Sequence, residues 1–282
     1  MGLGGYLTWT AVARELKQRL PEDIKIIPIE AHGSFIKLIK SEIFWNNPNF
    51  IQNFSENNHL NFPIVLNNPD ANYCKQDLPD RVKHRFDKHI IEQICEVYGI
   101  QNPKLKCEIF LSNSEEEVGR NLRNDIGPYI AIEPQSNDGY GVNKVFPFDK
   151  WKKISKDLSN SGLKLVQIGK KTQEKFLEYA NTDFLGKTSF REAASIIKYS
   201  DLFVSSEGGL MHAANAVEKK SVIVYSGFIH PKMTGYPENI NLWAGESHGP
   251  CGMKSKCEDC QKDMENYDYR NIISAVHHLM EK

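Results

Sequence analysis

The sequence has 282 residues, of which 40% are apolar and 25% charged, values that are typical of globular proteins. This length exceeds the size at which one hydrophobic core usually stops growing, so we expect two domains of similar size. The 35 basic and 36 acidic residues give a formal net charge of -1, and we therefore expect no nucleic acid partner. No apolar run approaches the roughly 20 residues that cross a bilayer, and the N-terminus lacks a signal-peptide pattern. We therefore expect a cytoplasmic protein with at most peripheral membrane contact.

The N-terminal half is predicted to be an irregular α/β unit. We expect a helix from about Leu7 to Leu20, a strand at 25–30 (KIIPIE), and a helix from about Asp80 to Tyr98. The chain starts on a glycine turn, MGLGG, without the apolar strand that precedes such a turn in a doubly wound domain. We therefore predict that the first strand of this domain is missing.

The C-terminal half alternates between apolar strands and helices, which indicates a parallel sheet covered on both faces. The predicted strands are 129–134, 163–169, 201–206, 221–227 and 240–245, and the predicted helices are 148–162, 172–179, one capped by Ser189 and Glu192, and 267–282. The polar segment SNSEEEVGRNLRNDIG at 112–127 marks the boundary. We therefore predict an N-terminal domain at 1–125 and a C-terminal domain at 126–282.

The stretch SSEGGLMH at 205–212 is the strongest candidate site, because it lies where an apolar strand ends and a helix begins. Open α/β sheets bind ligands at the carboxyl ends of their strands, and a helix N-terminus offers free N–H groups to a phosphate. Gly208 and Gly209 have no Cβ and let a ligand approach the backbone, while Glu207 is suited to sugar or ribose hydroxyls. The alternative is a tight turn in which Glu207 caps the helix.

An ordered series of motifs resembles glycosyltransferase family 9, the ADP-heptose-dependent heptosyltransferases of lipopolysaccharide synthesis. The motifs are YIAIEP at 129–134, NKVFPFDKW at 143–151, LVQIG at 165–169, LGKTSFREAASIIKYSDLFV at 185–204, SSEGGLMHAANAV at 205–217 and IVYSGFIHPKMTGY at 223–236. A fainter similarity of GLGGYLTWTAVARELK and FWNNPNF extends the resemblance to the N-terminal half. The resemblance implies a GT-B fold, in which two Rossmann-like domains with parallel sheets face each other across a cleft.

The resemblance also implies a site for a nucleoside-diphosphate sugar, with ADP-heptose as the expected donor. Lys144 is similar in position to the family lysine that contacts the donor phosphates, and Glu207 to the acidic residue that holds the donor. The other expected donor contacts are Gln167, Gly169, Gly208, Gly209, Leu210, Met211 and His212. The alternatives are a solvated loop lysine at 144 and a packed helix histidine at 212.

The general base expected from the resemblance is an aspartate directly after the N-terminal glycine turn, where this sequence has Tyr6. Tyrosine, with a pKa of about 10, is a poor base at neutral pH. Glu30 and His32, at the end of the strand KIIPIE, are the best substitutes, although a structural role for each stays open.

Three cysteines, Cys251, Cys257 and Cys260, lie close together, and His248 completes a four-ligand set. This set suits a tetrahedral structural zinc or iron site, and the alternative is reduced cysteines in a surface loop. The resemblance implies that transfer itself needs no metal and no other cofactor, and no DxD motif stands in an obvious strand-end loop.

We therefore expect an inverting, metal-independent glycosyltransferase that moves a sugar, in this family heptose, onto a glycan or lipid-linked glycan such as the lipopolysaccharide core. A sugar-nucleotide epimerase on the same fold is the first alternative. A catalytically degenerate GT-B protein that only binds its ligand is the second.

Overall fold

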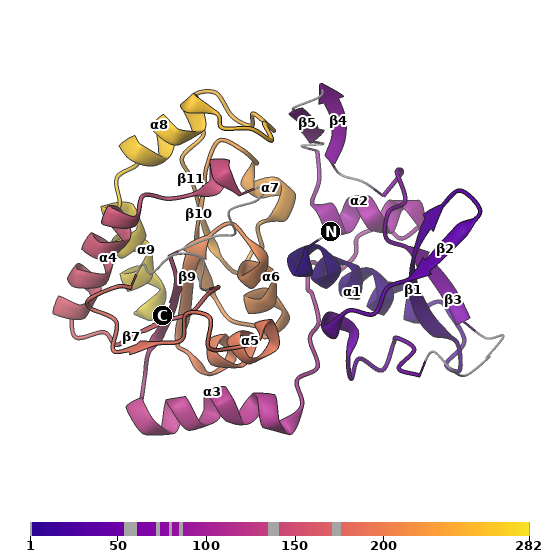
Figure 1. Ribbon diagram of the computed structural model, residues 1–282, viewed down its shortest axis with the longest axis horizontal. Helices are drawn as coiled ribbons and strands as arrows, with labels where there is room; N and C mark the ends of the chain where they lie inside the picture. The colour runs from indigo at the N-terminus through magenta and orange to yellow at the C-terminus, as the bar shows by residue number, and fades with distance from the viewer. Residues whose placement is uncertain are drawn as a thin grey trace.

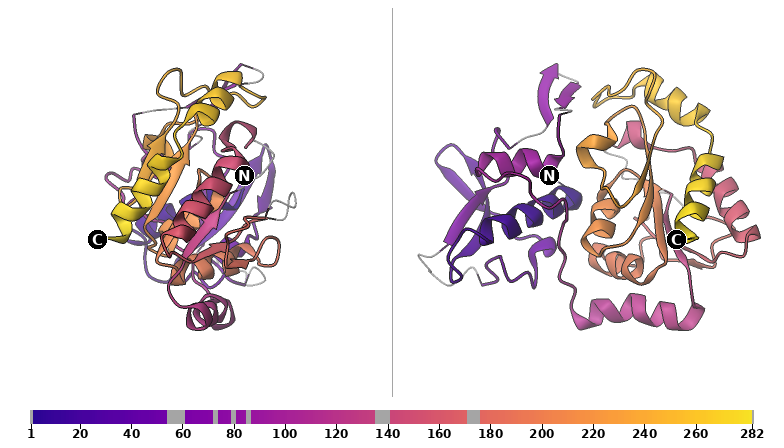
Figure 2. Two further views of the ribbon diagram at one scale, coloured as in Figure 1. Left: turned by 90° about the vertical axis from the view of Figure 1, so that its left-hand side faces the viewer. Right: turned by 180° about the vertical axis from the view of Figure 1, so that it is seen from behind.

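Figure 1 shows the computed structural model of the chain, which describes residues 2–53, 61–71, 74–78, 81–84, 87–134, 141–170 and 176–281. Two α/β lobes lie side by side, and the view from behind in Figure 2 shows the same arrangement. We call the elements from α1 to α2 the N-terminal lobe and those from β6 to α9 the C-terminal lobe. No helix within the described ranges is long and apolar enough to cross a membrane.

The C-terminal lobe contains a six-stranded sheet in which every neighbouring pair of strands is parallel. The strand order is β11-β10-β9-β6-β7-β8. The strands are β6 (Ile130–Glu133), β7 (Leu165–Gln167), β8 (Thr182–Asp183), β9 (Leu202–Ser206), β10 (Ser221–Tyr225) and β11 (Ile240–Trp243). Residues of β9 and β10 are buried throughout, which explains why they read as continuous apolar runs. The five strands predicted for this half are confirmed, and β8 is an additional short edge strand.

Helices cover both faces of this sheet, as predicted. One core lies under α4 (Phe148–Asn160) and α9 (Arg270–Met280), and the other under α5 (Phe190–Tyr199) and α6 (Gly209–Ala216). The capping box at the start of α5 is confirmed, because the Ser189 side chain accepts from the Glu192 N–H group and Glu192 accepts from the Ser189 N–H group. Two short helices, α7 (Pro231–Thr234) and α8 (Glu258–Asn266), follow β10 and β11.

The strand order reverses between β6 and β9. From β6 the chain moves to β7 and β8 on one side and then crosses to β9, β10 and β11 on the other. Such a switch point opens a crevice at the carboxyl ends of the two central strands, and ligands of doubly wound folds bind there. The turn formed by Glu207 and Gly208 follows β9 and therefore lies at this point of the sheet.

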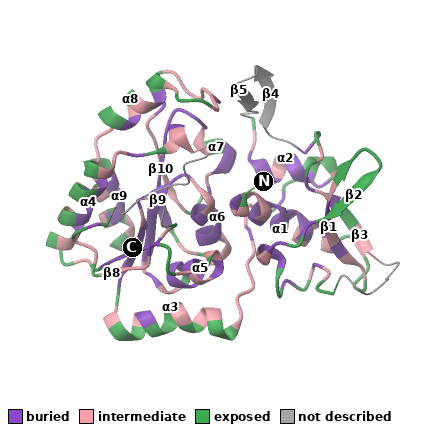
Figure 3. Ribbon diagram, in the orientation of Figure 1, coloured by how far each residue is buried: buried purple, intermediate pink, exposed green. Residues whose placement is uncertain are grey.

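The N-terminal lobe has a smaller sheet of order β2-β1-β3. Strand β1 (Lys25–His32) pairs with β3 (Asn61–Val65) in parallel but with β2 (Phe35–Leu38) in antiparallel fashion. This sheet is therefore mixed rather than parallel, because Gly33, with a φ of 61°, closes a tight hairpin between β1 and β2. Figure 3 shows this hairpin as an exposed projection of the lobe. A separate two-stranded ribbon, β4 (Cys74–Leu78) and β5 (Arg81–His84), precedes helix α2.

Three helices differ from their predicted bounds. Helix α1 spans Leu3–Lys17, so the first glycines lie in its first turn rather than in a loop before it. Helix α2 spans only Ile90–Val97, because strand β5 occupies residues that we expected to be helical. Residues 176–179 form no helix, and the rest of the helix predicted at 172–179 lies outside the described residues.

The polar segment at 112–127 forms helix α3 (Asn113–Ile126), preceded by a capping box of Ser112 and Glu115. The helix packs against α5 at the lower edge of the view in Figure 1. The contact is so close that a Cβ on Gly119 would lie 2.3 Å from the carbonyl oxygen of Ser195. The segment is polar because only Gly119 and Leu122 are buried along the helix.

The lobes meet along α1, in which every residue from Leu7 to Ala13 is buried. The helix packs against α2 on one side and α6 on the other, and a single hydrophobic core continues from one lobe into the other. The η1 turn (Glu42–Phe44) also contacts α1. Burial of seven successive residues covers every side of the helix along this stretch, as expected for a helix that lies between two layers.

Candidate functional site

The turn between β9 and α6 leaves the N-terminus of α6 free to bind a ligand. Gly208 has an extended backbone, the Glu207 N–H group donates to Val224 O at 3.0 Å, and the helix begins at Gly209. No side chain of the described residues caps α6. The first N–H groups of a helix have no partner within the helix and carry its positive partial charge, so they favour an anion here.

Lys144 and Glu207 are brought together at this turn. They form an ion pair, with side-chain exposures of 20% for Lys144 and 6% for Glu207. The ammonium group of Lys144 also lies 5.1 Å from the centre of the Phe228 ring. A cation with some solvent access therefore stands beside the uncapped helix, next to an acceptor for hydroxyl groups.

Lys144 is held in place by its neighbour Asn143, which is 1% exposed. The Asn143 amide donates to the carbonyl oxygens of Met253 at 2.8 Å and Ser255 at 2.7 Å, and its oxygen accepts from the Cys257 N–H group at 2.7 Å. Gln261 of α8 donates to the Val142 carbonyl oxygen at 3.1 Å. The short η2 turn (Val142–Lys144) is thus fixed by the loop that leads into α8.

A second helix N-terminus lies against the first. Gly4, in the first turn of α1, packs so closely on α6 that a Cβ on Gly4 would lie 2.9 Å from Gly209 Cα and 2.9 Å from His212 Cδ2. The N-cap of α1 is Gly2, which supplies no side-chain cap either. Two uncapped N-termini at one point place positive partial charge from both lobes in the same place, and this arrangement favours an anion bound beside the contact.

Glu133 was missed in the sequence-based prediction. It ends β6 and is paired in register with Ser205 of β9, so it lies at the switch point of the sheet. Burial raises the pKa of Glu133 to about 8. Its Cγ would lie 3.5 Å from a Cβ on Gly169, whose φ of 134° also favours glycine. The available signal was an acidic residue that ends an apolar strand directly before Pro134.

The remaining predicted donor contacts differ in how accessible they are. Gln167 is fully buried and accepts from the Leu177 N–H group at 2.7 Å. Leu210 and Met211 are buried in the core, where Met211 sulfur accepts from the Tyr225 hydroxyl at 2.9 Å. The other three predicted donor contacts are glycines at strand ends. Gly208 and Gly209 lie between β9 and α6, and Gly169 follows β7.

His212 lies under the turn at the lobe junction. Its Nδ1 shares a hydrogen bond of 2.6 Å with the Tyr236 hydroxyl, which lies 3.1 Å from Cys107 Sγ. Burial and then the charge of Lys144 lower the pKa of His212 to about 3, so the imidazole is neutral at physiological pH. A neutral ring adds no charge beside Lys144.

The three residues considered as bases lie in the N-terminal lobe. Tyr6, two residues after Gly4, contacts the Phe44 ring, and burial followed by the charge of Glu30 raises the pKa of its hydroxyl. Glu30 lies 3.6 Å from His32 Nε2 and 3.8 Å from Lys37 Nζ, measured from Oε2. Glu30 and Tyr6 are therefore within electrostatic reach, whereas the His32 side chain is 56% exposed on the hairpin.

The predicted cysteine cluster forms a group of its own behind η2. The ligand atoms of His248, Cys257 and Cys260 lie within 4.8 Å of one another, and Cys251 Sγ lies 3.2 Å from Cys260 Sγ. The cysteines are free thiols. The cluster is therefore the place in the described part of the chain where side chains could hold a metal ion.

The architecture is that of the GT-B proteins, since two α/β lobes meet at a site on the carboxyl ends of the larger parallel sheet. The fold is similar to E. coli ADP-heptose LPS heptosyltransferase II (TM-score 0.51, 16% identity, 68% of this chain and 62% of that one). It is also similar to a family 9 glycosyltransferase from Veillonella parvula (TM-score 0.53, 14% identity, 70% and 62%). A third similar structure is the dodecameric iron-containing heptosyltransferase TibC of enterotoxigenic E. coli in complex with ADP-D-β-D-heptose (TM-score 0.51, 14% identity, 78% and 59%).

The family model of glycosyltransferase family 9 (heptosyltransferase) matches residues 76–263, which is more than half of the chain. The chain therefore belongs to this family. It spans less than two thirds of the length of each of the three similar structures. No curated protein matches it by sequence.

The contact between the two helix N-termini predicts the effect of Gly4→Ala. The added methyl group would overlap Gly209 Cα, so the lobes must move apart, and we expect a loss of about 1–3 kcal/mol in the free energy of unfolding. Urea denaturation measures this loss. Gly2→Ala is the control, because a Cβ there meets nothing within 4 Å and should change stability by less than about 0.5 kcal/mol. Equal stability of the two variants would contradict the packing described.

The raised pKa of the partly buried Glu133 predicts a pH-dependent effect of Glu133→Gln. A carboxyl whose pKa rises from 4.5 to about 8 on folding costs stability progressively as the pH rises from about 4.5 to 8. The variant should therefore gain Tm relative to the wild type by at least about 2–4 °C more at pH 8 than at pH 5. Differential scanning calorimetry measures the gain, with the exposed Glu238→Gln as control. A Tm difference that is the same at both pH values would show that Glu133 is not buried as described.

Proposed function

We propose that the protein is a glycosyltransferase that moves a sugar from a nucleoside-diphosphate donor to a glycan acceptor. The observation that carries the proposal is the convergence of two uncapped helix N-termini with Lys144 and Glu207 at the switch point of the sheet. A diphosphate suits the two N-termini and the ammonium group, and the Glu207 carboxylate suits a sugar or ribose hydroxyl. Membership in family 9 supports this assignment.

The site is arranged to stabilise a leaving group. Transfer of the sugar leaves additional negative charge on the nucleoside diphosphate, and fixed positive groups aimed at that charge lower the barrier. Lys144 and the two N-termini supply such groups, so the chemical step as proposed requires no divalent cation. Lys144 pairs with Glu207 at the turn, and we expect the donor diphosphate to compete with the carboxylate for the Lys144 ammonium group.

We propose ADP-heptose as the donor, a glycan or lipid-linked glycan such as the lipopolysaccharide core as the acceptor, and inversion at the anomeric carbon. The name of the family and the ADP-D-β-D-heptose in the TibC complex support the donor. The free thiols of the described residues fit a reducing compartment, which supports a cytoplasmic site of action. An epimerase would convert the donor without an acceptor, so analysis of products from the donor alone distinguishes the two activities.

Among the three candidate bases we propose Glu30. A tyrosine whose pKa is raised stays protonated at neutral pH, and the exposed His32 is tied to Glu30. The charge of Glu30 raises the pKa of the Tyr6 hydroxyl, so the two side chains are near each other. Tyr6 and Gly4 lie in the same turn of α1, and Gly4 contacts the N-terminus of α6. A carboxylate supplied by the N-terminal lobe would thus accept the proton of the acceptor hydroxyl.

Donor binding tests the first part of the proposal. We expect Lys144→Ala to weaken the binding of ADP-heptose by about tenfold to a hundredfold, because one charge-assisted contact to the diphosphate is lost. A thermal-shift titration with the sugar nucleotide measures the change. Lys152→Ala, which removes a lysine paired with Asp149 on the surface, should bind as the wild type does. Undiminished binding by Lys144→Ala would contradict this site.

Kinetics of transfer test the base. Glu30→Gln should lower kcat by about a hundredfold or more and leave the affinity for the donor unchanged, because only proton transfer is affected. Tyr6→Phe should retain most of the activity. If Glu30→Gln keeps its kcat while Tyr6→Phe loses it, Glu30 is not the base. A wild-type protein that binds donor but transfers no sugar to any glycan would favour the degenerate binding protein instead.

A further inference from the structure

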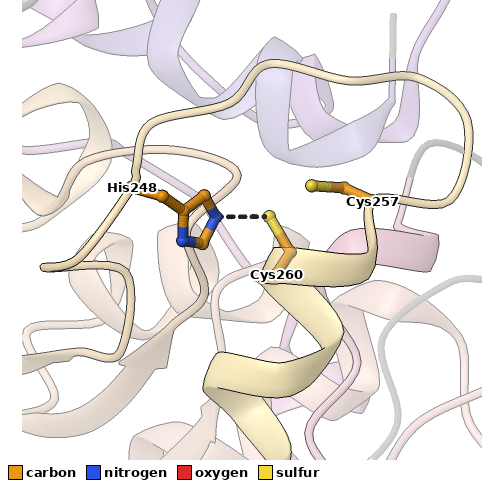
Figure 4. Close-up of side chains that lie close together, drawn as sticks. All are labelled: His248, Cys257 and Cys260. Atoms are coloured by element: carbon orange, nitrogen blue, oxygen red, sulfur yellow. Dashed lines mark hydrogen bonds between the residues drawn. The ribbon is translucent and has the colours of Figure 1, made fainter.

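The segment between β11 and α8 brings four metal-ligating side chains together on the far side of η2. Figure 4 shows the ring of His248 and the thiols of Cys257 and Cys260 pointing toward one another. Cys260 is fully buried, while the other two are partly buried. Cys251 joins them, since its Sγ lies 3.2 Å from Cys260 Sγ. The loop after β11 and the start of α8 therefore supply three sulfur atoms and one nitrogen atom.

The spacing of the His248, Cys257 and Cys260 ligand atoms suits binding to one metal ion. Metal–sulfur bonds of about 2.3 Å and metal–nitrogen bonds of about 2.0 Å require ligand atoms about 3.5–3.8 Å apart. His248 Nε2 lies 3.6 Å from Cys260 Sγ, and the ligand atoms of His248, Cys257 and Cys260 all lie within 4.8 Å of one another. Cys251 is not one of these three, so its side chain must move toward His248 and Cys257 to complete a four-ligand site.

His248 is also oriented in the way that a metal ligand requires. Its Nδ1 lies 3.0 Å from Asp263 Oδ2, an ion-pair distance, and its Nε2 lies 3.6 Å from Cys260 Sγ. A metal-bound histidine is usually held by such a carboxylate, which selects the tautomer and raises the basicity of the nitrogen that binds. The ring lies against Gly227, where a Cβ would come within 2.6 Å of Nε2. The position of the ring is therefore defined on both sides.

We propose that His248, Cys251, Cys257 and Cys260 form a structural site for one thiolate-preferring metal ion, zinc or iron. Three thiolates and one imidazole fill a tetrahedral site and leave no open position for a substrate. The ion would have a structural role and would take no part in sugar transfer. Asp263 is a positioning residue for His248.

The metal would also set the position of Lys144. The loop between Cys251 and Cys257 supplies the carbonyl and N–H groups that hold Asn143, and Asn143 directly precedes Lys144. Closing this loop on an ion fixes the η2 turn and hence the lysine at the α6 N-terminus. This second step rests on the proposed function, whereas the metal site itself does not.

Metal analysis of the full-length protein tests the site. The protein is produced in medium containing zinc and iron and desalted, and metal content is measured by inductively coupled plasma mass spectrometry. We expect about one ion per chain in the wild type, less than a tenth of that in Cys257→Ser, and the full amount in Cys95→Ala, which removes a buried cysteine outside the cluster. Which element is found decides between zinc and iron. A metal-free wild type, a Cys251–Cys260 disulfide in its mass spectrum, or full occupancy in Cys257→Ser would overturn the proposal.

Asp263→Asn keeps all four ligands and covers the case in which Cys257→Ser does not fold. We expect this variant to hold the ion about tenfold to a hundredfold more weakly in competition with a chromophoric chelator. Unchanged affinity would overturn the positioning role and the proposed geometry. ADP binding is measured on the same samples before and after chelation. If the protein loses its metal but still binds ADP, the link to Lys144 is contradicted and the metal site is not. If the protein binds metal but never binds ADP, only the proposed function is contradicted.

Discussion

The contact between Gly4 and Gly209 is the constraint on which the rest of the structure depends. It brings the N-termini of α1 and α6 together, and neither has a side-chain cap within the described ranges. Two positive helix ends in contact are unfavourable by themselves, and the apolar packing of α1 along α6 offsets this cost. An anion bound beside the two ends offsets the repulsion, so the same contact that joins the lobes favours anion binding next to it.

Polar networks around this contact hold the lobes in register. The buried guanidinium of Arg191 forms two hydrogen bonds to Glu115 of α3 and donates to the carbonyl oxygens of Glu42 and Phe110. It thereby ties α5 to α3, to the connecting chain and to the N-terminal lobe, and it lowers the pKa of Glu115 to about 2. Arg191 thus links the two lobes, whereas Asn143 fixes the position of Lys144 within the C-terminal lobe. Both side chains donate several hydrogen bonds, which is what makes a buried polar group compatible with stability.

Much of the C-terminal lobe follows from local sequence, because a strand buried on both faces is a short apolar run and a capping box is a four-residue pattern. The strand-to-helix turn after β9 was accessible for the same reason, and the family resemblance implied that Lys144 and Glu207 belong to one site. Their ion pair was not predicted. The start of α1 and the role of Arg191 were not, since both depend on contacts between residues that are far apart in the chain. The raised pKa of Glu133 likewise comes from burial at the switch point, which no local pattern encodes.

The central claim is that the lobe junction recognises a diphosphate, and isothermal titration calorimetry with ADP and with adenosine tests it most directly. The two ligands share the nucleoside and differ in the group that the helix N-termini and Lys144 would bind. The account predicts that ADP binds and that adenosine binds at least about a hundredfold more weakly, which corresponds to about 2.7 kcal/mol. Adenosine binding as tightly as ADP, or no binding of ADP at all, would contradict it.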